Sequence, residues 1–97
     1  MSERKPYIVC CGTNGRAVIF GFSETEPVSG ESIVLHDARM VLYWAAECGG
    51  LFGLAVSGPK GVSRITQAIP VTETGTVQQW LAVTDVAADE IAKWAVA

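Results

Sequence analysis

The sequence predicts a small α+β domain. Its sheet should be mostly antiparallel and strongly curved or barrel-like, with about six strands, a short central helix and a C-terminal helix. Short runs of β-branched and aromatic residues alternate with Gly, Pro and Asn turn signals along most of the chain. Helical spacing of apolar residues is confined to one central and one terminal segment. No β-α-β alternation runs through the chain, so neighbouring strands should be antiparallel.

The length and composition indicate one domain, residues 1–97, that associates with itself. The chain has 97 residues, of which 49% are hydrophobic and 18% are charged, against a usual charged share of about 25%. A small domain with few charges leaves apolar surface uncovered, and a homo-oligomer would cover it.

The charge and hydropathy of the sequence argue against two classes of partner, nucleic acids and membranes. The net charge is −3 and the seven basic residues are scattered, whereas nucleic-acid binders gather basic residues into a patch. We therefore expect no binding to bulk DNA or RNA. Apolar runs are too short to span a bilayer and the N-terminus is polar, so we expect no membrane association and a cytoplasmic location.

The first third of the chain is predicted to form three strands. Runs at Tyr7–Cys11 and Arg16–Phe22 flank Gly12–Gly15, where Asn-Gly favours positive φ, and this pattern is typical of a hairpin. Residues 23–30 form a loop rich in Pro, Gly, Ser and Thr. Glu31–His36 is the third predicted strand.

The segment from Asp37 to Trp44 has two interpretations. Asp37 could cap a helix, in which Arg39 and Tyr43 would share a face. Its β-branched and aromatic residues favour a strand instead, preceded by a turn at residues 36–38. A regular strand would put two sets of side chains on opposite faces: Met40, Leu42 and Trp44 against Arg39, Val41 and Tyr43.

The remaining elements are predicted from the spacing of apolar residues and from the positions of glycine and proline. Ala45–Ser57 is predicted as a helix weakened by three glycines, and Gly58-Pro59 ends it. Val62–Val71 is a strand with Pro70 near its end, and Val77–Val83 is another strand. The last helix spans Val86–Val96, with Thr84 or Asp85 as its cap.

No catalytic residue, metal site or cofactor is predicted. The three cysteines form no Cys-x-x-Cys motif, and adjacent Cys10 and Cys11 should point to opposite faces of a strand. The single histidine, His36, has no local nucleophile signature beside it. An enzyme is therefore the least supported class, although the sequence leaves it open.

Five residues are the candidates for ligand binding. Aromatic faces and guanidinium groups stack on bases and bind phosphates, and they also anchor protein interfaces. The tryptophans can equally be packing residues of the core. The candidates are Arg39, Tyr43, Trp44, Lys60 and Arg64.

The segment Leu35–Trp44 resembles a motif in a family of small phage and prophage proteins of unknown function. It reads Leu-His-Asp-Ala-Arg-Met-Val-Leu-Tyr-Trp. Members carry Leu-x-Asn-Ala-Arg and then Tyr-Trp, a Leu/Ala-rich segment with glycine, and Ser-x-Ile. The last two correspond to Leu51–Gly58 and Ser63–Ile65. The resemblance covers Ile33 to about Val71 and departs at Asp37, where the family has Asn, and around Gly49-Gly50. It implies a viral origin and no particular activity.

Two functions fit these observations. In the first, a phage accessory protein counters host defence by sequestering a small anionic immune signal of the cyclic-nucleotide type in pockets of a homo-oligomer. Arg39, Lys60 and Arg64 would contact phosphates, and Tyr43 or Trp44 would stack on a base. In the second, the protein inhibits a host protein through an apolar and aromatic patch.

Overall fold

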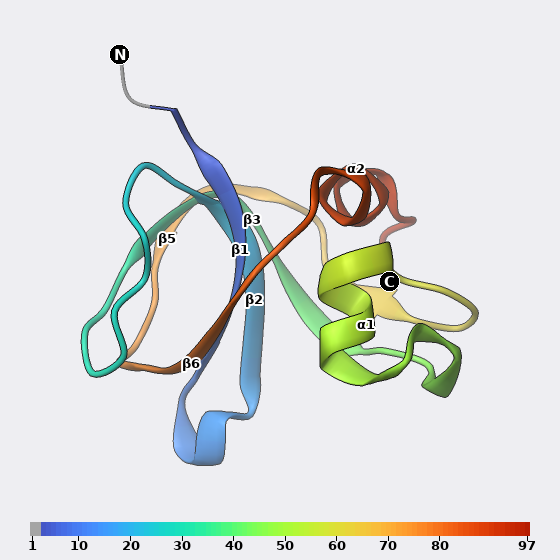
Figure 1. Cartoon of the computed structure of the whole chain (residues 1–97), viewed down its shortest axis with the longest axis horizontal. Coiled ribbons are helices and arrows are strands. Elements are labelled where there is room, and N and C mark those ends of the chain that lie inside the picture. Colours follow the sequence, from blue (N-terminus) through green and yellow to red (C-terminus); the bar gives the residue numbers. More distant parts are fainter. Residues whose placement is uncertain (1–2) are drawn as a thin grey trace.

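The computed structural model describes residues 3–97 as a six-stranded antiparallel sheet with two α-helices (Figure 1). Two 3₁₀ turns interrupt the connections, at Thr13–Gly15 and Ala46–Cys48. The elements in chain order are β1 (Lys5–Cys11), β2 (Ala17–Ser23), β3 (Val34–Tyr43), α1 (Gly50–Ser57), β4 (Arg64–Ile65), β5 (Ile69–Glu73), β6 (Val77–Ala82) and α2 (Asp85–Lys93).

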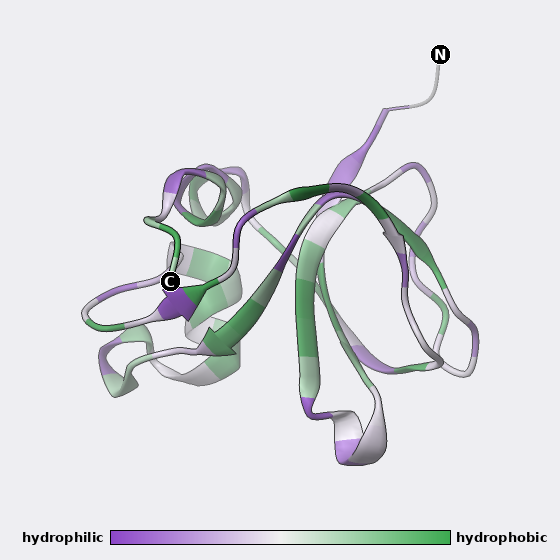
Figure 2. Ribbon diagram, turned by 180° about the vertical axis from the view of Figure 1, so that it is seen from behind, coloured by the Kyte–Doolittle hydropathy of each residue, from purple (hydrophilic) through white to green (hydrophobic). Residues whose placement is uncertain are grey.

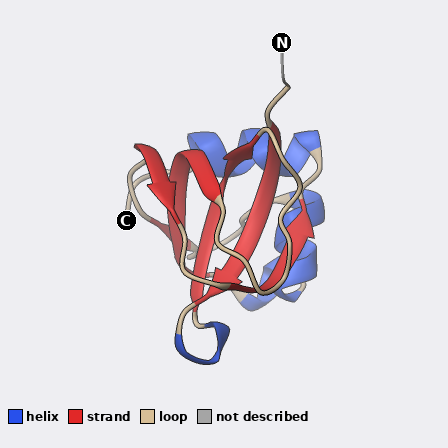
Figure 3. Ribbon diagram, turned by 90° about the vertical axis from the view of Figure 1, so that its left-hand side faces the viewer, coloured by secondary structure: helices blue, strands red, loops and turns tan. Residues whose placement is uncertain are grey.

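The predicted α+β class, the strand number and the antiparallel pairing are confirmed. The strands lie in the order β4-β3-β2-β1-β6, and β5 pairs with the first half of β3 while β4 pairs with its second half. The sheet is not closed into a barrel, because no ladder joins β6 to β5 among the described residues. Figure 3 shows α1 and α2 together behind one face of the sheet.

Both faces of the sheet are buried, by different parts of the chain. Figure 2 shows hydrophobic residues concentrated along the strands and α1, with hydrophilic residues at the turns. The helix-side core consists of Ile8, Cys10, Val18, Phe20, Val41, Leu54, Ala55, Ile65, Val83, Ala87, Ala88 and Ile91. The second core, on the opposite face, consists of Val9, Cys11, Ile19, Ile33, Leu35, Ala38 and Val77.

Adjacent residues of β1 confirm the predicted alternation. Cys10 belongs to the helix-side core and Cys11 to the second core. The predicted hairpin is also present, since β1 pairs with β2 along its whole length. Asn14 adopts a φ of 57° in the connecting turn, the conformation that Asn tolerates better than most residues.

The predicted turn at residues 36–38 is wrong, because β3 runs through it as a single strand. Phe22 pairs with His36 and Phe20 with Arg39, so three steps along β3 match two steps along β2. This is a β-bulge, and Asp37 occupies it with a φ of 50°. The extra residue keeps the chain direction but reverses the alternation of side chains beyond it.

Gly21 provides the space that the bulge needs on the neighbouring strand. A Cβ atom at Gly21 would lie 2.7 Å from the Cβ atom of Leu35, closer than two such atoms can approach. The bulge therefore depends on Asp37 for its backbone conformation and on Gly21 for close strand approach.

The predicted helix over Ala45–Ser57 is shorter than expected. Gly49 and Gly50 have φ values of 82° and 75°, outside the right-handed helical region. The chain therefore forms a 3₁₀ turn before them and begins α1 at Gly50. Leu54 and Ala55 are buried in the helix-side core.

The predicted strand over Val62–Val71 is instead two short strands. β4 pairs Ile65 with Val41, and β5 pairs Val71 with His36, on different halves of β3. The residues between them lie outside the ladders because the bulge bends β3 at this point.

The C-terminal helix is confirmed, with Thr84 as its N-cap, but it ends at Lys93, three residues before the predicted end at Val96. The Thr84 hydroxyl accepts a hydrogen bond from the Ala87 N–H at 3.1 Å. Ala87 and Ile91 are fully buried on the sheet side, and Trp94 packs against the same core. Neither α1 nor α2 is long and apolar enough to cross a bilayer, and the part of the chain described holds no other α-helix.

We predict that Asp37→Val destabilises the protein by about 1–2 kcal/mol, because a β-branched residue is strained at positive φ. Asp37→Asn should leave the free energy of unfolding within about 0.5 kcal/mol of wild type, because Asn tolerates this conformation. Urea denaturation followed by tryptophan fluorescence measures both. Equal midpoints for the Val and Asn variants would contradict a strained bulge at this position.

Candidate functional site

Arg39 lies inside the protein, with 4% of its surface exposed. Its Nε donates to the Thr66 carbonyl at 2.6 Å, and its Nη1 donates to the carbonyls of Ile91 and Ala92 at 2.6 and 3.2 Å. Its Nη2 is buried and has no partner among the described atoms. Burial lowers the pKa of this guanidinium from its ordinary value.

The three carbonyls compensate the buried charge of Arg39. Ile91 and Ala92 lie in the last turn of α2, where carbonyls lack the usual helical donor and carry the negative end of the helix dipole. The Ile91 carbonyl also accepts from the Trp94 N–H at 3.3 Å. The guanidinium therefore ties β3 to the end of α2 and to the segment after β4. It is directed into the protein and away from the surface.

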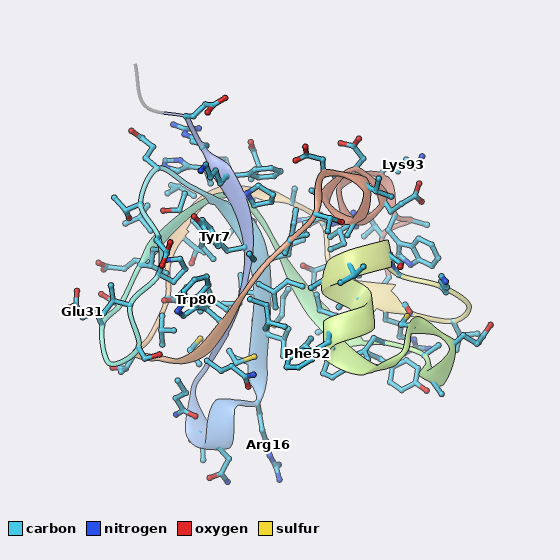
Figure 4. All side chains as sticks on the ribbon, viewed as in Figure 1. Tyr7, Arg16, Glu31, Phe52, Trp80 and Lys93 are labelled. Carbon is cyan, nitrogen blue, oxygen red and sulfur yellow. The ribbon has the colours of Figure 1, made fainter. Side chains whose placement is uncertain are left out.

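The tryptophans also make internal contacts. Trp44 is half-buried and packs against the helix-side core, as does Trp94. The Trp94 indole N–H donates to the Ser63 carbonyl at 2.9 Å. Trp80 meets Tyr7 edge to face, with ring centroids 5.8 Å apart, and Figure 4 shows both rings on the side of the sheet away from the helices.

Lys60 lies in a tight turn whose backbone is held by hydrogen bonds to the buried side chains of Cys48 and Ser63. Its N–H donates to the Cys48 Sγ at 3.3 Å, and its carbonyl accepts from the Ser63 hydroxyl at 2.7 Å. The same hydroxyl accepts from the Ala45 N–H at 3.1 Å. The Lys60 side chain is exposed, but it does not line a hollow with the other candidates.

Tyr43 and Arg64 are the two candidates that the structure brings together. They are paired residues on β3 and β4, and both are exposed. With Leu42 and Val62 they line an open hollow of about 470 Å³, which we call the Tyr43–Arg64 hollow. Leu42, Tyr43 and Val62 are 54%, 50% and 72% exposed.

The electrostatics of the Tyr43–Arg64 hollow come from one arginine. Within residues 3–97 the ion pairs are Arg4–Glu24 at 3.8 Å and Glu90–Lys93 at 3.1 Å. The Arg64 guanidinium is thus not engaged by a carboxylate of its own chain in the described structure. It can bind an anionic group while the surrounding apolar surface packs against a large side chain.

Leu42 and Val62 were not among the predicted site residues. Both are aliphatic, and aliphatic residues in β-rich runs are normally buried. The short strand β4 brings the segment of Val62 beside the end of β3. That pairing joins residues about twenty positions apart, and no local pattern indicates it.

A second hollow also lies outside the sequence predictions. It has a volume of about 490 Å³ beside Trp80, between the start of β1 and the end of β6. Its lining mixes acidic and basic groups, so no single sign of charge dominates. The residues are Glu3, Arg4, Lys5, Pro6, Tyr7, Glu26, Trp80, Ala82, Val83 and Asp85.

The three cysteines lie inside the protein. Burial, with a smaller contribution from Cys11, raises the pKa of the Cys10 thiol, which keeps it protonated. Cys11 and Cys48 are buried too. Across residues 3–97 no cysteine hydrogen-bonds to His36, and no group of three metal-ligating side chains occurs.

The comparisons with known proteins identify a family model but no characterised relative. A model described as a domain of unknown function (DUF6948) matches residues 4–92. This confirms the expectation of a family with no assigned activity. The matched span includes Arg39, Tyr43 and Arg64. No curated protein and no solved structure matches the chain.

We predict that Arg39→Met lowers the free energy of unfolding by about 2–4 kcal/mol, because it removes three charge-assisted hydrogen bonds to backbone carbonyls. Arg39→Lys should give an intermediate loss, since one ammonium cannot reach all three acceptors. Thermal and urea unfolding measure both.

Arg64→Met is the matched control for this prediction, because it removes an exposed arginine from the same sheet. It should change stability by less than about 0.5 kcal/mol. An Arg39→Met variant as stable as Arg64→Met would show that Arg39 does not hold α2 in place.

Proposed function

We propose that this chain, which belongs to the DUF6948 family of unknown function, is a non-enzymatic binding module that engages another protein through the Tyr43–Arg64 hollow. The observation that carries the proposal is the convergence of exposed apolar side chains around one exposed arginine. Apolar side chains gathered at one place mark interaction sites more often than scattered ones do.

The side chains that line the Tyr43–Arg64 hollow indicate which side chains the partner carries. A guanidinium binds a carboxylate through two parallel hydrogen bonds. The side chains of Leu42, Tyr43 and Val62 offer apolar surface beside it, and tyrosine and arginine are enriched among residues that dominate interface energies. The partner segment therefore carries a large apolar or aromatic side chain next to a carboxylate.

The partner that we propose is a host protein, and inhibition is the consequence. The resemblance of Leu35–Trp44 to phage and prophage proteins supports a viral origin, and a host protein is a partner that suits a virus-encoded binding module. Within that class, a defence protein is the target that we propose. The binding surface itself does not depend on this origin.

Sequestration of a small nucleotide is the second candidate. Tyr43 and Arg64 are paired across two strands, so a base could stack on the phenol ring while a phosphate binds the guanidinium. The hollow has one cation in its lining, whereas a cyclic dinucleotide carries two phosphates. A homo-oligomer that joined two hollows would supply the second arginine. The single cation makes the protein partner the better supported proposal.

We predict that random peptides selected on the purified protein become enriched in Asp or Glu beside Leu, Phe or Trp. Arg64→Glu should abolish the acidic preference by reversing the charge, and Tyr43→Ala should weaken the selected peptides at least tenfold. Isothermal titration of the best peptides measures both effects.

Val56→Glu and Phe52→Ala are the controls, because both side chains are exposed on α1 and lie outside the hollow. They should leave peptide affinity unchanged. Peptides without acidic enrichment, or an affinity insensitive to Arg64→Glu, would refute the proposed recognition.

Filtration distinguishes the nucleotide candidate. The protein is mixed with cyclic di- and oligonucleotides, and the filtrate is analysed before and after denaturation. Retention of an intact nucleotide that depends on Arg64 would favour sequestration. Full recovery before denaturation would exclude it for the nucleotides tested, and a degraded nucleotide would reveal an enzyme.

A further inference from the structure

The hollow beside Trp80, with a volume of about 490 Å³, takes no part in the recognition proposed above. We call it the Trp80 hollow. Three segments far apart in the sequence line it: the start of β1, the loop that follows β2, and the end of β6 with the first residue of α2. Figure 1 shows that loop on the opposite side of the strands from α1. The strand order β4-β3-β2-β1-β6 places the Trp80 hollow at the opposite edge of the sheet from the Tyr43–Arg64 hollow.

Two aromatic side chains form one wall of the Trp80 hollow. Tyr7 on β1 and Trp80 on β6 meet edge to face, with ring centroids 5.8 Å apart. Trp80 packs against the second core but is only partly buried, so part of its indole remains open to a ligand. Indole is the aromatic side chain that attracts a cation most strongly through its π face.

The Tyr7 hydroxyl is a polar group without a partner. Tyr7 is 7% exposed, yet its hydroxyl makes no hydrogen bond within residues 3–97. It is also not sealed inside, because the buried side-chain atom left without a partner in this part of the chain is Arg39 Nη2. The hydroxyl therefore reaches the surface where Tyr7 lines the Trp80 hollow. A mostly buried phenol usually has a hydrogen-bond partner, which a bound group would supply.

Carboxylates outnumber the free cations around the Trp80 hollow. Both signs of charge occur in the lining, but Arg4 has its Nε 3.8 Å from a carboxylate oxygen of Glu24, which lies outside the lining. Lys5 is then the cation that remains. None of the lining carboxylates forms an ion pair within residues 3–97. They belong to Glu3, Glu26 and Asp85.

Asp85 and Lys5 both count for less than their formal charges. Asp85 lies in the first turn of α2, where its carboxylate offsets the positive end of the helix dipole. Lys5 is exposed, and its ammonium sits on a flexible stem that can turn into solvent. The carboxylates available beside the aromatic wall are therefore those of Glu3 and Glu26.

We propose that the Trp80 hollow binds an organic cation, a guanidinium or an alkylammonium group. The cation lies against the indole of Trp80, its charge is balanced by Glu26, and one of its N–H groups donates to the Tyr7 hydroxyl oxygen. The lining acids do not gather into a group of three that could hold a metal ion within residues 3–97. Carboxylates spread around an aromatic wall suit a larger cation with dispersed charge.

This site goes beyond the proposed function, because it lies at the other edge of the sheet and prefers the opposite charge. The Tyr43–Arg64 hollow presents a cation to a carboxylate, whereas the Trp80 hollow presents carboxylates to a cation. The same cationic chemistry occurs in a basic side chain of another protein and in a free amine. Ligands of both kinds therefore enter the test.

A titration followed by nuclear magnetic resonance tests the site on the full chain. The indole N–H signal of Trp80 is identified as the one that Trp80→Phe removes. N-acetylarginine amide should shift this signal until it saturates. N-acetylcitrulline amide has nearly the same shape without the charge, and it should bind about fivefold more weakly or not at all, because the cation–π and ionic contacts are lost.

Two charge variants determine the sign of the preferred ligand. Glu26→Gln should weaken N-acetylarginine amide about threefold, and Lys5→Gln should strengthen it about twofold, because one removes an opposite charge and the other a like charge. Glu31→Gln is the matched control, since it removes an exposed carboxylate of the same loop that does not line the hollow. It should leave the affinity unchanged.

Two aromatic variants test the wall. Tyr7→Phe removes only the hydroxyl and should weaken binding about threefold through the lost hydrogen bond. Trp80→Leu should abolish saturable binding, followed on the backbone amide of Ala82. Circular dichroism shows whether each variant is folded. Because Trp80 also packs against the second core, an unfolded Trp80→Leu would leave Glu26→Gln and Lys5→Gln to decide.

Spermidine and a capped Ala-Arg-Ala peptide distinguish the two sources of the cation. Tighter binding of the peptide assigns the hollow to a basic side chain of another protein, and tighter binding of spermidine assigns it to a free amine. Either result supports a cation site.

Three results would overturn the cation site. They are a Trp80 signal that N-acetylarginine amide leaves unmoved, equal affinity for the citrulline derivative, or charge variants that change affinity in the reverse directions. The last result would assign the hollow to an anion. Arg64→Glu should leave all of these titrations unchanged, and Glu26→Gln should leave the acidic peptides unchanged, so the two proposals fail separately.

Discussion

A buried arginine without a carboxylate partner joins parts of the chain that are far apart in sequence. Arg39 lies on β3, and its guanidinium donates to carbonyls after β4 and at the end of α2. Carbonyls at the end of a helix are the acceptors that a cation can use when no acid is present. The seating of α2 therefore depends on Arg39. So does the path of the C-terminal residues, whose Trp94 reaches Ser63 and whose Ala97 pairs with Ile65.

Arg39 reaches these carbonyls only because of the bulge before it. Without the extra residue at Asp37, strand alternation would place residue 39 on the same face as Leu35, which lies in the second core. The bulge reverses the alternation, and Arg39 and Val41 instead face the helices. Both Asp and Asn tolerate the positive φ that this requires, so Asp37 is compatible with a family motif that has Asn there.

The sequence predicted an element correctly where the residues that determine it are neighbours in the chain. The Asn-Gly turn and the Thr84 cap are each decided within a few residues. The turn predicted at residues 36–38 failed because turn and bulge use the same residue chemistry. Only pairing with β2, and the space left by Gly21, distinguishes them.

The site was predicted less completely than the fold, for a physical reason. A guanidinium on a β-rich run is expected to face solvent, and the carbonyls that bury Arg39 are about fifty residues away. Tyr43 and Arg64 were proposed together from their chemistry, but Val62 joins them only through pairing of a two-residue strand. Contacts between residues far apart in sequence form only when the chain folds, and the spacing of apolar residues along the sequence does not indicate them.

The division between buried and exposed residues limits what this protein can recognise. One arginine is used inside to hold a helix, and the exposed basic groups stay dispersed, so polyanion binding has little support. Valines, a phenylalanine and a tyrosine are at the same time left half or more exposed. Both cores are already filled, one on each face of the sheet, so these side chains cannot be buried within the chain. The recognition that we propose therefore depends on apolar contact, in which single charges such as that of Arg64 set the orientation of the partner.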